Sequence, residues 1–244
     1  MPTTLRHAYK PHYNQNNLIM ETDPTLVLYL PNPNILKQNN DLNPYTWPDY
    51  SNYGNHGTIY GATWTEKGLY FDGIDDYVII PHYPLMEQGE FTLTLWQKVE
   101  KCTTSWTFSV SKDWLGGQSG WMIENKEYSL TSVETSFIWN YSGGYQGISY
   151  LDNIYGRWCF IAVVYSESLN IAKLYFNGVL KSQLSPITPY GKATGSLILW
   201  GSSWMGNKDE IRFYNRVLSD AEVQALYQNG LNERFNRRVY YEKI

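Results

Sequence analysis

The chain has 244 residues, of which 43% are hydrophobic and 17% charged, so it can bury a sizeable core and global disorder is excluded. The formal net charge of -4 produces no single-sign field strong enough to attract nucleic acid or an anionic membrane, so neither is expected as a partner. Tyrosine (22 residues) and tryptophan (10 residues) are abundant, which is typical of β-proteins and of binding surfaces.

The N-terminal segment, residues 1–22, is polar, and we expect it to form an arm with little core of its own. It lacks the apolar region of a signal peptide, and no later stretch reaches the length of a membrane span, so no membrane insertion is expected. Three locations stay open: inside a cell, in a virion, or outside the cell by a non-standard route.

Short apolar runs follow, separated by turn residues. Residues 25–31 predict a first strand, and residues 32–57 form a long loop rich in Asn, Pro and Gly, of the kind that a ligand often holds in place. Residues 68–81 predict a hairpin-like pair of strands around Asp72-Gly73, with Val78 and Ile80 on one face.

Further strands and turn signals continue to the C-terminal part of the chain. Residues 157–165 are apolar on both faces, as in a central strand, and Asn177-Gly178 marks a tight hairpin turn. The other strands are predicted at residues 91–99, 172–180, 196–201 and 210–215. With no long helix between them, they predict an all-β fold, a two-sheet antiparallel jelly-roll sandwich.

One short C-terminal helix is expected. Ser219 is a good N-cap, and Glu222 three residues later completes a capping box, with Leu218 and Val223 as the flanking hydrophobic contact. We expect the helix to pack one apolar stripe on the sandwich and to end at Gly230. Residues 231–244 then form a basic tail.

The two cysteines, Cys102 and Cys159, are too few for a disulfide framework and fit no zinc motif. They are read as two buried thiols at strand positions, with a single bridge as the alternative.

Four ordered motifs resemble laminin-G-like domains of the concanavalin A-like lectin/glucanase superfamily. They are "DYSNYGNHGTIYGATW" (49–64), "LYFDGIDDYVIIP" (69–81), the pair "RWCFIAVVY" and "LYFNGVL" (157–180), and "DEIRFYNRVLSDAEVQALYQNG" (209–230). The resemblance implies a jelly-roll domain over residues 23–230, with residues 1–22 and 231–244 outside it.

The resemblance also implies a structural calcium ion where the early loop meets the final strand. The matching positions are Asp49 and Asp209, with Asn52 and the His56 carbonyl as further ligands. Calcium prefers six to eight oxygen ligands, which carboxylates and turn carbonyls supply. The alternative is that both aspartates only cap turns.

The acidic residues give no catalytic pattern. Asp75-Asp76 and Asp209-Glu210 are adjacent, so in a strand their side chains point to opposite faces. Glu134 has no partner at strand spacing. The two carboxylates that a glycosidase needs are therefore not recognisable, and we expect no enzyme.

Four aromatic residues in polar or glycine-flanked loops are the candidate carbohydrate-binding residues. Aromatic rings of this kind stack on the apolar face of a sugar, and glycine allows close approach of the backbone. The candidates are Trp114, Tyr141, Tyr145 and Trp204. By contrast, Trp96, Trp121, Trp139, Trp158 and Trp200 are expected in the core or on a sheet face.

The sequence therefore predicts a non-catalytic module that binds carbohydrate or glycoprotein through loop aromatics, with a structural calcium. One alternative is a virion or surface structural protein on the same fold, self-associating through residues 1–22 or 231–244. A second alternative is a glycan-active hydrolase or lyase.

Overall fold

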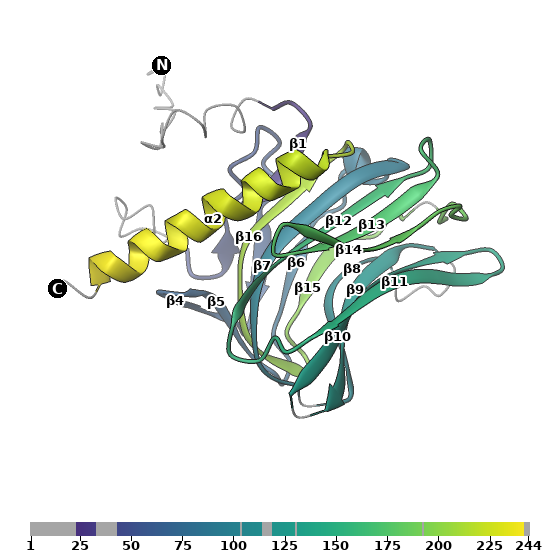
Figure 1. Cartoon of the computed structure of the whole chain (residues 1–244). Coiled ribbons are helices and arrows are strands. Elements are labelled where there is room, and N and C mark those ends of the chain that lie inside the picture. Colours follow the sequence, from purple (N-terminus) through teal and green to yellow (C-terminus); the bar gives the residue numbers. More distant parts are fainter. Residues whose placement is uncertain are drawn as a thin grey trace, which may run out of the picture.

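Two antiparallel β-sheets and one long helix form the domain (Figure 1). The computed structural model describes residues 23–32, 43–102, 104–113, 119–129, 131–191 and 193–241, with side chains up to residue 234. The predicted two-sheet jelly-roll sandwich is confirmed, because every strand pair within the two sheets is antiparallel.

Sheet A has eight strands in the order β14, β13, β12, β7, β16, β5, β4, with β1 paired to β16 beside that path. In chain order its strands are β1 (Leu26–Leu30), β4 (Thr63–Thr65), β5 (Gly68–Asp72), β7 (Glu90–Cys102), β12 (Trp158–Ser166), β13 (Ile171–Phe176), β14 (Val179–Leu184) and β16 (Trp204–Tyr214).

Sheet B also has eight strands, in the order β11, β10, β9, β8, β15, β6, β3, β2. In chain order these are β2 (Thr46–Trp47), β3 (Gly57–Tyr60), β6 (Tyr77–Ile80), β8 (Trp106–Lys112), β9 (Trp121–Ser129), β10 (Ser132–Tyr141), β11 (Gly144–Asp152) and β15 (Leu197–Trp200). A short 3-10 helix, η2 (Pro84–Met86), lies between β6 and β7.

The hairpin predicted for residues 68–81 is wrong. β5 belongs to sheet A and β6 to sheet B, so the chain crosses between the two sheets at Gly73–Asp76. Gly73 adopts a positive φ of 85°, and the carboxylate of Asp76 accepts the N–H of Asp72 at 2.8 Å, which closes the turn. Alternating apolar residues predict two strands but do not state whether those strands pair.

The hairpin at Asn177-Gly178 is confirmed. Both residues have positive φ, 51° and 75°, and Phe176 pairs with Val179 across the turn. Two consecutive positive φ values define the tight turn that suits the twist of a two-stranded hairpin.

The main core lies between the two sheets. In β12, Ile161 and Val163 point into this core, whereas Phe160, Ala162 and Val164 point to the opposite side of the sheet. Both sets are fully buried, which confirms the prediction that residues 157–165 form a central strand with apolar side chains on both faces. The two cysteines are likewise buried and unpaired, as expected.

Helix α2 (Asp220–Tyr241) covers the outer face of sheet A, where it lies across β16, β7 and β12 (Figure 1). Its Val223 and Leu226, with Leu218 just before the helix, join the apolar cluster on that face. The predicted capping box is confirmed: the Ser219 N–H and hydroxyl donate to Glu222 at 2.7 and 2.8 Å, and the Glu222 N–H donates to the Ser219 hydroxyl.

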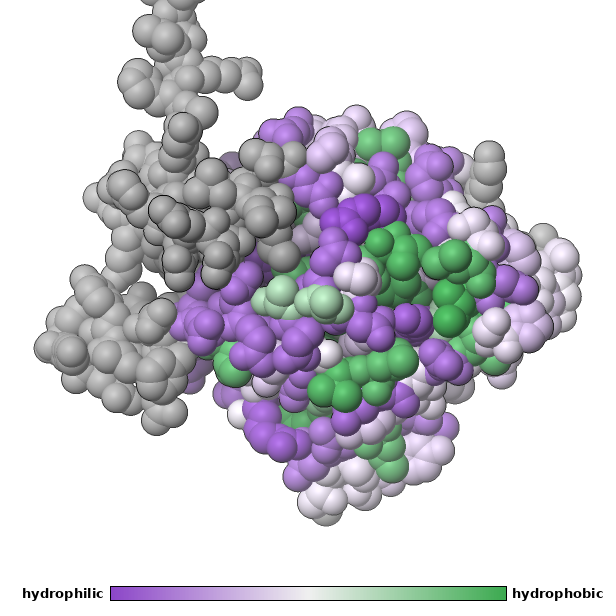
Figure 2. Space-filling model, turned by 45° about the horizontal axis from the view of Figure 1, so that its top comes forward, coloured by the Kyte–Doolittle hydropathy of each residue, from purple (hydrophilic) through white to green (hydrophobic). Residues whose placement is uncertain are grey.

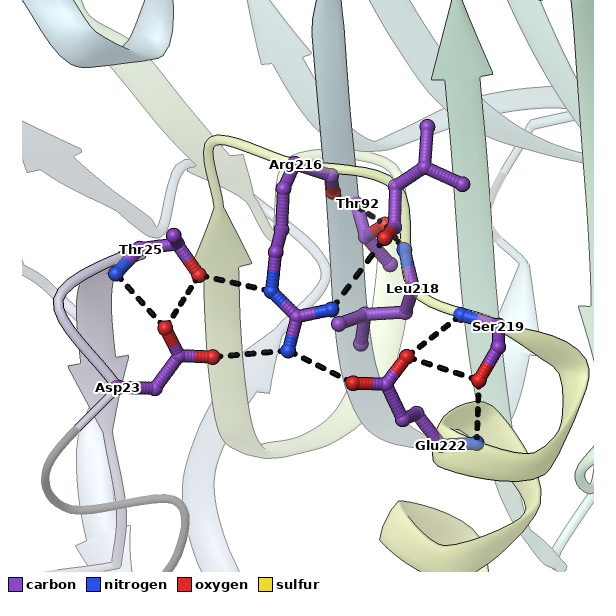
Figure 3. A network of polar contacts seen from close by, with 8 residues as sticks. Asp23, Thr25, Thr92, Arg216, Leu218, Ser219 and Glu222 are labelled. Atoms are coloured by element: carbon purple, nitrogen blue, oxygen red, sulfur yellow. Dashed lines mark hydrogen bonds and ion pairs between the residues drawn. The ribbon is translucent and has the colours of Figure 1, made fainter.

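Arg216 joins three elements near the start of α2 (Figure 3). Its guanidinium donates to Asp23 at 2.9 Å and to the Thr25 hydroxyl at 3.0 Å, beside β1, and pairs with Glu222 of α2 at 2.7 Å. The Thr92 hydroxyl of β7 donates to the Arg216 carbonyl and accepts the Leu218 N–H. These contacts fix the helix start to β1 and β7 of sheet A.

The predicted end of the helix at Gly230 is wrong, because α2 continues to Tyr241. Gly230 is instead buried where the helix approaches sheet A, and a Cβ at this position would lie 2.4 Å from Nε1 of Trp96. The glycine therefore serves a close approach between the helix and the sheet. Helix formation accordingly extends over residues 231–241, which were expected to form a tail.

The surface on the α2 side is mixed in character. Figure 2, in which the top of the first view comes forward, shows polar residues interleaved with several separate apolar patches. Separate patches of this kind are ordinary on a globular surface. Among the described residues, no helix has the length and apolar character needed to cross a bilayer.

Candidate functional site

The outer face of sheet B carries side chains of a different kind from its inner face. Along β6 and β15, Val78 and Leu199 point into the core, so their neighbours Tyr77 and Trp200 point outward. The same alternation places Ile123 of β9 in the core and Glu124 on the outer face.

Four aromatic rings form a row across four neighbouring strands. Tyr60 of β3 stacks on Tyr77 of β6 with ring centroids 4.6 Å apart and nearly parallel planes. Tyr77 is 6.3 Å from Trp200 of β15, which is 6.4 Å from Phe108 of β8. Each neighbouring pair lies within the 4.5–7 Å range of interacting rings. We call Tyr60, Tyr77, Trp200 and Phe108 the aromatic row.

The aromatic row is partly exposed and held in place. Tyr60 is 43% exposed, and the other three rings are half-buried. The indole N–H of Trp200 donates to the Ser111 hydroxyl at 2.7 Å, which fixes its orientation. Preset rings lose little conformational entropy when they bind a flat apolar ligand surface.

Beyond the aromatic row, a lysine lies between two exposed rings. Lys126 of β9 pairs across the sheet with Trp106 of β8, and its ammonium is 5.4 Å from that ring and 5.2 Å from the ring of Tyr128. Trp106 is 61% exposed. Both distances are within the range of a cation–π contact.

Two glutamates stand on the same face, on the next strands. Glu124 of β9 lies opposite Phe108 on one side and Ser136 of β10 on the other. Glu134 lies two residues before Ser136, and its carboxylate accepts the Ser149 hydroxyl of β11 at 2.8 Å. Glu124 and Glu134 are thus diagonal neighbours on one face, within reach of long side chains. We call them the carboxylate pair.

Glu124 has an unusual environment for a carboxylate. It is 4% exposed, and its Oε2 has no hydrogen-bond partner in the described part of the chain. Burial raises the pKa of Glu124, and the charge of Glu134 adds to this, while Trp106, Lys126 and Ser136 act in the opposite direction. Desolvation and a like charge are the two effects that favour the protonated form of an acid.

The sequence contains no local signal for the aromatic row or for the carboxylate pair. Tyr60 and Trp200 are 140 residues apart, and Glu124 and Glu134 lie on two strands joined by a turn whose register the sequence does not state. In the sequence, Glu134 therefore has no recognisable carboxylate partner. The pairing of β9 with β10 places Glu124 diagonal to it.

The candidate loop aromatics that the structure describes are not brought together. Trp204 is fully buried at the start of β16, against Phe71 and under the Lys208 ammonium, so the prediction that its ring lies in an exposed loop is wrong. Glycine and serine neighbours suggested a loop, but the indole instead fills space in the core. Tyr145 is 72% exposed and Tyr141 is half-buried; both lie at the β10–β11 hairpin, where Tyr145 pairs with Asn140 and Tyr141 with Gly144, so their side chains point to opposite faces. Trp114 lies outside the described residues.

Asp49 holds the early loop to β1. Its Oδ1 accepts the N–H groups of Tyr29 and Ser51, and its Oδ2 accepts the Ser51 hydroxyl and the Asn55 N–H, all within 2.7–2.9 Å. The Asp49 N–H donates to Nδ1 of His56. A carboxylate has about four lone-pair positions, so protein donors occupy those of Asp49. The side chain of the remaining candidate ligand, Asn52, is exposed.

Asp209 lies in a different network, fully buried next to α2. Its carboxylate accepts from the Arg234 guanidinium at 3.0 Å, and Arg234 also pairs with Glu210 at 3.5 Å. A guanidinium at this position opposes a second cation. With the Asp49 carboxylate occupied by protein donors and the Asp209 carboxylate paired with a guanidinium, the two do not fit a calcium ion bound by both. The calcium ion stays a prediction from the resemblance.

A separate acidic group holds the crossing between the sheets. Carboxylate oxygens of Asp72, Asp75 and Asp76 lie within 4.8 Å of one another. Two of these side chains already bind backbone N–H groups of the turn, those of Asp72 and Ile74. Turn formation accounts for the presence of these acids.

Comparison with known proteins places this geometry in context. Residues 72–224 match the sequence model of the concanavalin A-like lectin/glucanase superfamily. A search of curated proteins finds no significant match.

Several solved structures are similar to this chain in fold. Two are the binding domains of botulinum neurotoxin serotype D (14% identity, TM-score 0.65) and serotype G (14% identity, TM-score 0.66). A third is the receptor binding domain of the botulinum neurotoxin C/D mosaic serotype (14% identity, TM-score 0.66). Each comparison covers 84% of this chain and 51–52% of the other, so this chain spans about half the length of those domains.

Proposed function

This chain belongs to the concanavalin A-like lectin/glucanase superfamily, and we propose that it is a binding module whose ligand lies along the aromatic row of sheet B. The proposed ligand is a carbohydrate, free or carried by a glycoprotein. The observation that carries this proposal is the aromatic row itself, Tyr60, Tyr77, Trp200 and Phe108, which crosses four strands on one outer face.

The chemistry of the face supports a sugar chain as ligand. Pyranose rings present apolar C–H faces that stack on aromatic rings, and their hydroxyl groups require hydrogen-bond partners beside those rings. Glu134 and Ser149, on β10 and β11, supply such partners beyond Phe108. The structural neighbours named receptor binding domains support a binding role of this kind by analogy of fold alone.

Binding to a glycan array, followed by calorimetry on the best glycan, tests the proposal. We expect Tyr60→Ala and Trp200→Ala each to weaken binding about tenfold or more, since loss of one stacked ring removes roughly 1–3 kcal/mol in comparable stacking interactions. Tyr50→Ala is the matched control, because Tyr50 is similarly exposed (40% against 43%) but lies beside β1 of sheet A. Equal binding by Tyr60→Ala, Trp200→Ala and Tyr50→Ala would contradict the proposal.

The hydrolase alternative has one specific observation in its favour, the carboxylate pair beside the aromatic row. Glycosidases use two carboxyl groups, one of them with a raised pKa, on either side of the bond that is cleaved. Release of new reducing ends from the bound glycan, lost in Glu124→Gln, would support that alternative. We expect binding without turnover.

Self-association through residues 1–22 or 231–244 stays a prediction. The first of these segments lies outside the described residues.

A further inference from the structure

We infer that the carboxylate pair selects the ligand of this face: it binds hydroxyl groups of a neutral glycan and excludes glycans that carry acidic groups. This inference rests on the proposed function, because it assigns a ligand class to the same face. It concerns the end of the face formed by β9, β10 and β11.

The first support is unused acceptor capacity. Glu134 is half-buried, and the Ser149 hydroxyl occupies one position of its carboxylate. A carboxylate accepts about four hydrogen bonds, so Glu134 and the exposed Ser149 can receive hydroxyl donors from a ligand.

The second support is the unmatched oxygen of Glu124. Oε2 of Glu124 is buried with no hydrogen-bond partner among the described residues, on a residue that lies opposite Ser136 and diagonal to Glu134. A buried acceptor without a donor is costly to a fold, and such groups are found where a ligand completes the hydrogen bonding. Trp106 and Ser136 donate to the Glu124 carboxylate, yet Oε2 itself is left without a partner among the described residues.

The third support is the balance of charge. Two carboxylates meet here, and the ammonium of Lys126, which lies opposite Glu134 across the sheet, is held near the rings of Trp106 and Tyr128. A uronate, sialic acid or sulfate placed against Glu134 would bring a third negative charge into a partly desolvated site. Repulsion of this kind discriminates between ligands even where the remaining contacts are the same.

Sugar hydroxyls supply the hydrogen-bond donors that the carboxylates lack and add no negative charge. They donate hydrogen bonds, carry no charge, and belong to rings whose apolar faces fit the adjacent aromatic row. A sugar that carries an ammonium group would also suit the carboxylates, so amino sugars are included in the experiment.

The test compares ligands that differ only at C6, where a neutral hydroxymethyl group is replaced by a carboxylate. Binding of β1,4-linked mannohexaose and of the β1,4-linked mannuronate hexamer, its C6-oxidised counterpart, is measured by calorimetry alongside a glycan array that includes neutral, acidic and amino sugars. If the array identifies another backbone, its neutral and uronate forms replace the mannose pair. We expect the neutral form to bind at least tenfold more tightly than the uronate.

Substitutions in the carboxylate pair test whether these two residues cause the preference for the neutral ligand. Glu134→Gln keeps the side-chain shape and removes one charge, so the gap between neutral and uronate ligands is expected to narrow several-fold. Glu124→Gln is expected to act in the same direction and serves as a second, independent variant. Glu66→Gln, which makes the same change of net charge in the exposed turn between β4 and β5, is expected to leave the gap unchanged.

Two failures are distinguishable. If the wild type binds the uronate as tightly as the neutral form while Trp200→Ala still abolishes binding, the inference is overturned and the proposed function stands. If no glycan on the array binds, or if Trp200→Ala has no effect, the proposed function fails and takes the inference with it. Preference for an amino sugar over the neutral form would also overturn the assignment of a neutral ligand.

Discussion

At the scale of single residues, the contact between α2 and sheet A depends on one glycine and one arginine. Arg234 lies between the rings of Trp96 and Trp158, at 4.3 and 4.5 Å, while its guanidinium reaches Asp209. Gly230, one turn earlier, lets the helix backbone approach Trp96. Position 230 was expected to end the helix because glycine is common there, but here its lack of a side chain serves packing.

Replacing this glycine tests the packing explanation. In Gly230→Ala the new Cβ would lie 2.4–3.0 Å from three atoms of the Trp96 ring. Overpacking costs about 1–3 kcal/mol and outweighs the gain of about 1 kcal/mol in helix propensity. We expect a lower free energy of unfolding in urea. The exposed Gln228→Ala is the control, with little change expected; a stabilised Gly230→Ala would show that the ring moves aside freely.

At the scale of elements, the start of α2 is held by charged groups whose pKa values are shifted. Hydrogen bonding to Arg216 lowers the pKa of Glu222, and the Tyr175 hydroxyl and Lys173 do the same for Asp220. For Asp23, burial acts to raise the pKa, yet the hydrogen bonds from Thr25 and Arg216 together bring it below its ordinary value. Each of these acids is therefore more stable ionised in the folded state than in the unfolded one.

Acidification should loosen this contact first. Because the folded pKa of Glu222 is depressed, its contribution to stability is fully present above the ordinary value of 4.5 and is lost as the pH falls through the lower folded value. We expect the melting temperatures of wild type and Glu222→Gln to differ at pH 6 and to converge as the pH falls below about 4. A difference that stays constant down to the lowest pH measured would contradict this role.

The elements also show how far local pattern determines tertiary placement. Strand alternation identified β5 and β6, and both strands exist. Their assignment to different sheets was not predictable, since a turn of four residues serves a hairpin or a crossing equally well. The early loop was expected to be held by a ligand; in its described part, Asp49, Ser51 and Asn55 bind the backbone of β1, and a ligand there stays a prediction.

At the scale of the whole molecule, the two sheets have different roles. Helix α2 covers the outer face of sheet A, whereas the outer face of sheet B carries the aromatic row and the carboxylate pair. One sheet thus supplies most of the scaffold and the other supplies the candidate contact surface. Fully buried tryptophans occur in both sheets, Trp96 and Trp204 in sheet A and Trp47, Trp121 and Trp139 in sheet B, whereas Trp106 and Trp200 lie on the outer face of sheet B.

Chelation tests the calcium prediction on the intact domain. Since protein donors already occupy the carboxylate of Asp49, and Arg234 contacts that of Asp209, we expect excess chelator to leave the melting temperature unchanged. Asp49→Ala is expected to lower it, by removing three hydrogen bonds within the early loop and one from the Tyr29 N–H of β1. A fall in melting temperature on chelation, reversed by added calcium, would establish the ion instead.

The sequence by itself determined the features that depend on neighbours along the chain: the all-β class, the alternating strands, the Asn177-Gly178 turn and the capping box at Ser219. These follow from backbone preferences and from contacts a few residues long. Only the tertiary structure decided which strands share a sheet, why Gly230 lies inside a helix, and that Trp204 is buried. It also brought Tyr60, Trp200 and Glu124 to one face, because strand order, which joins residues far apart in sequence, is set by the packing of the whole sandwich.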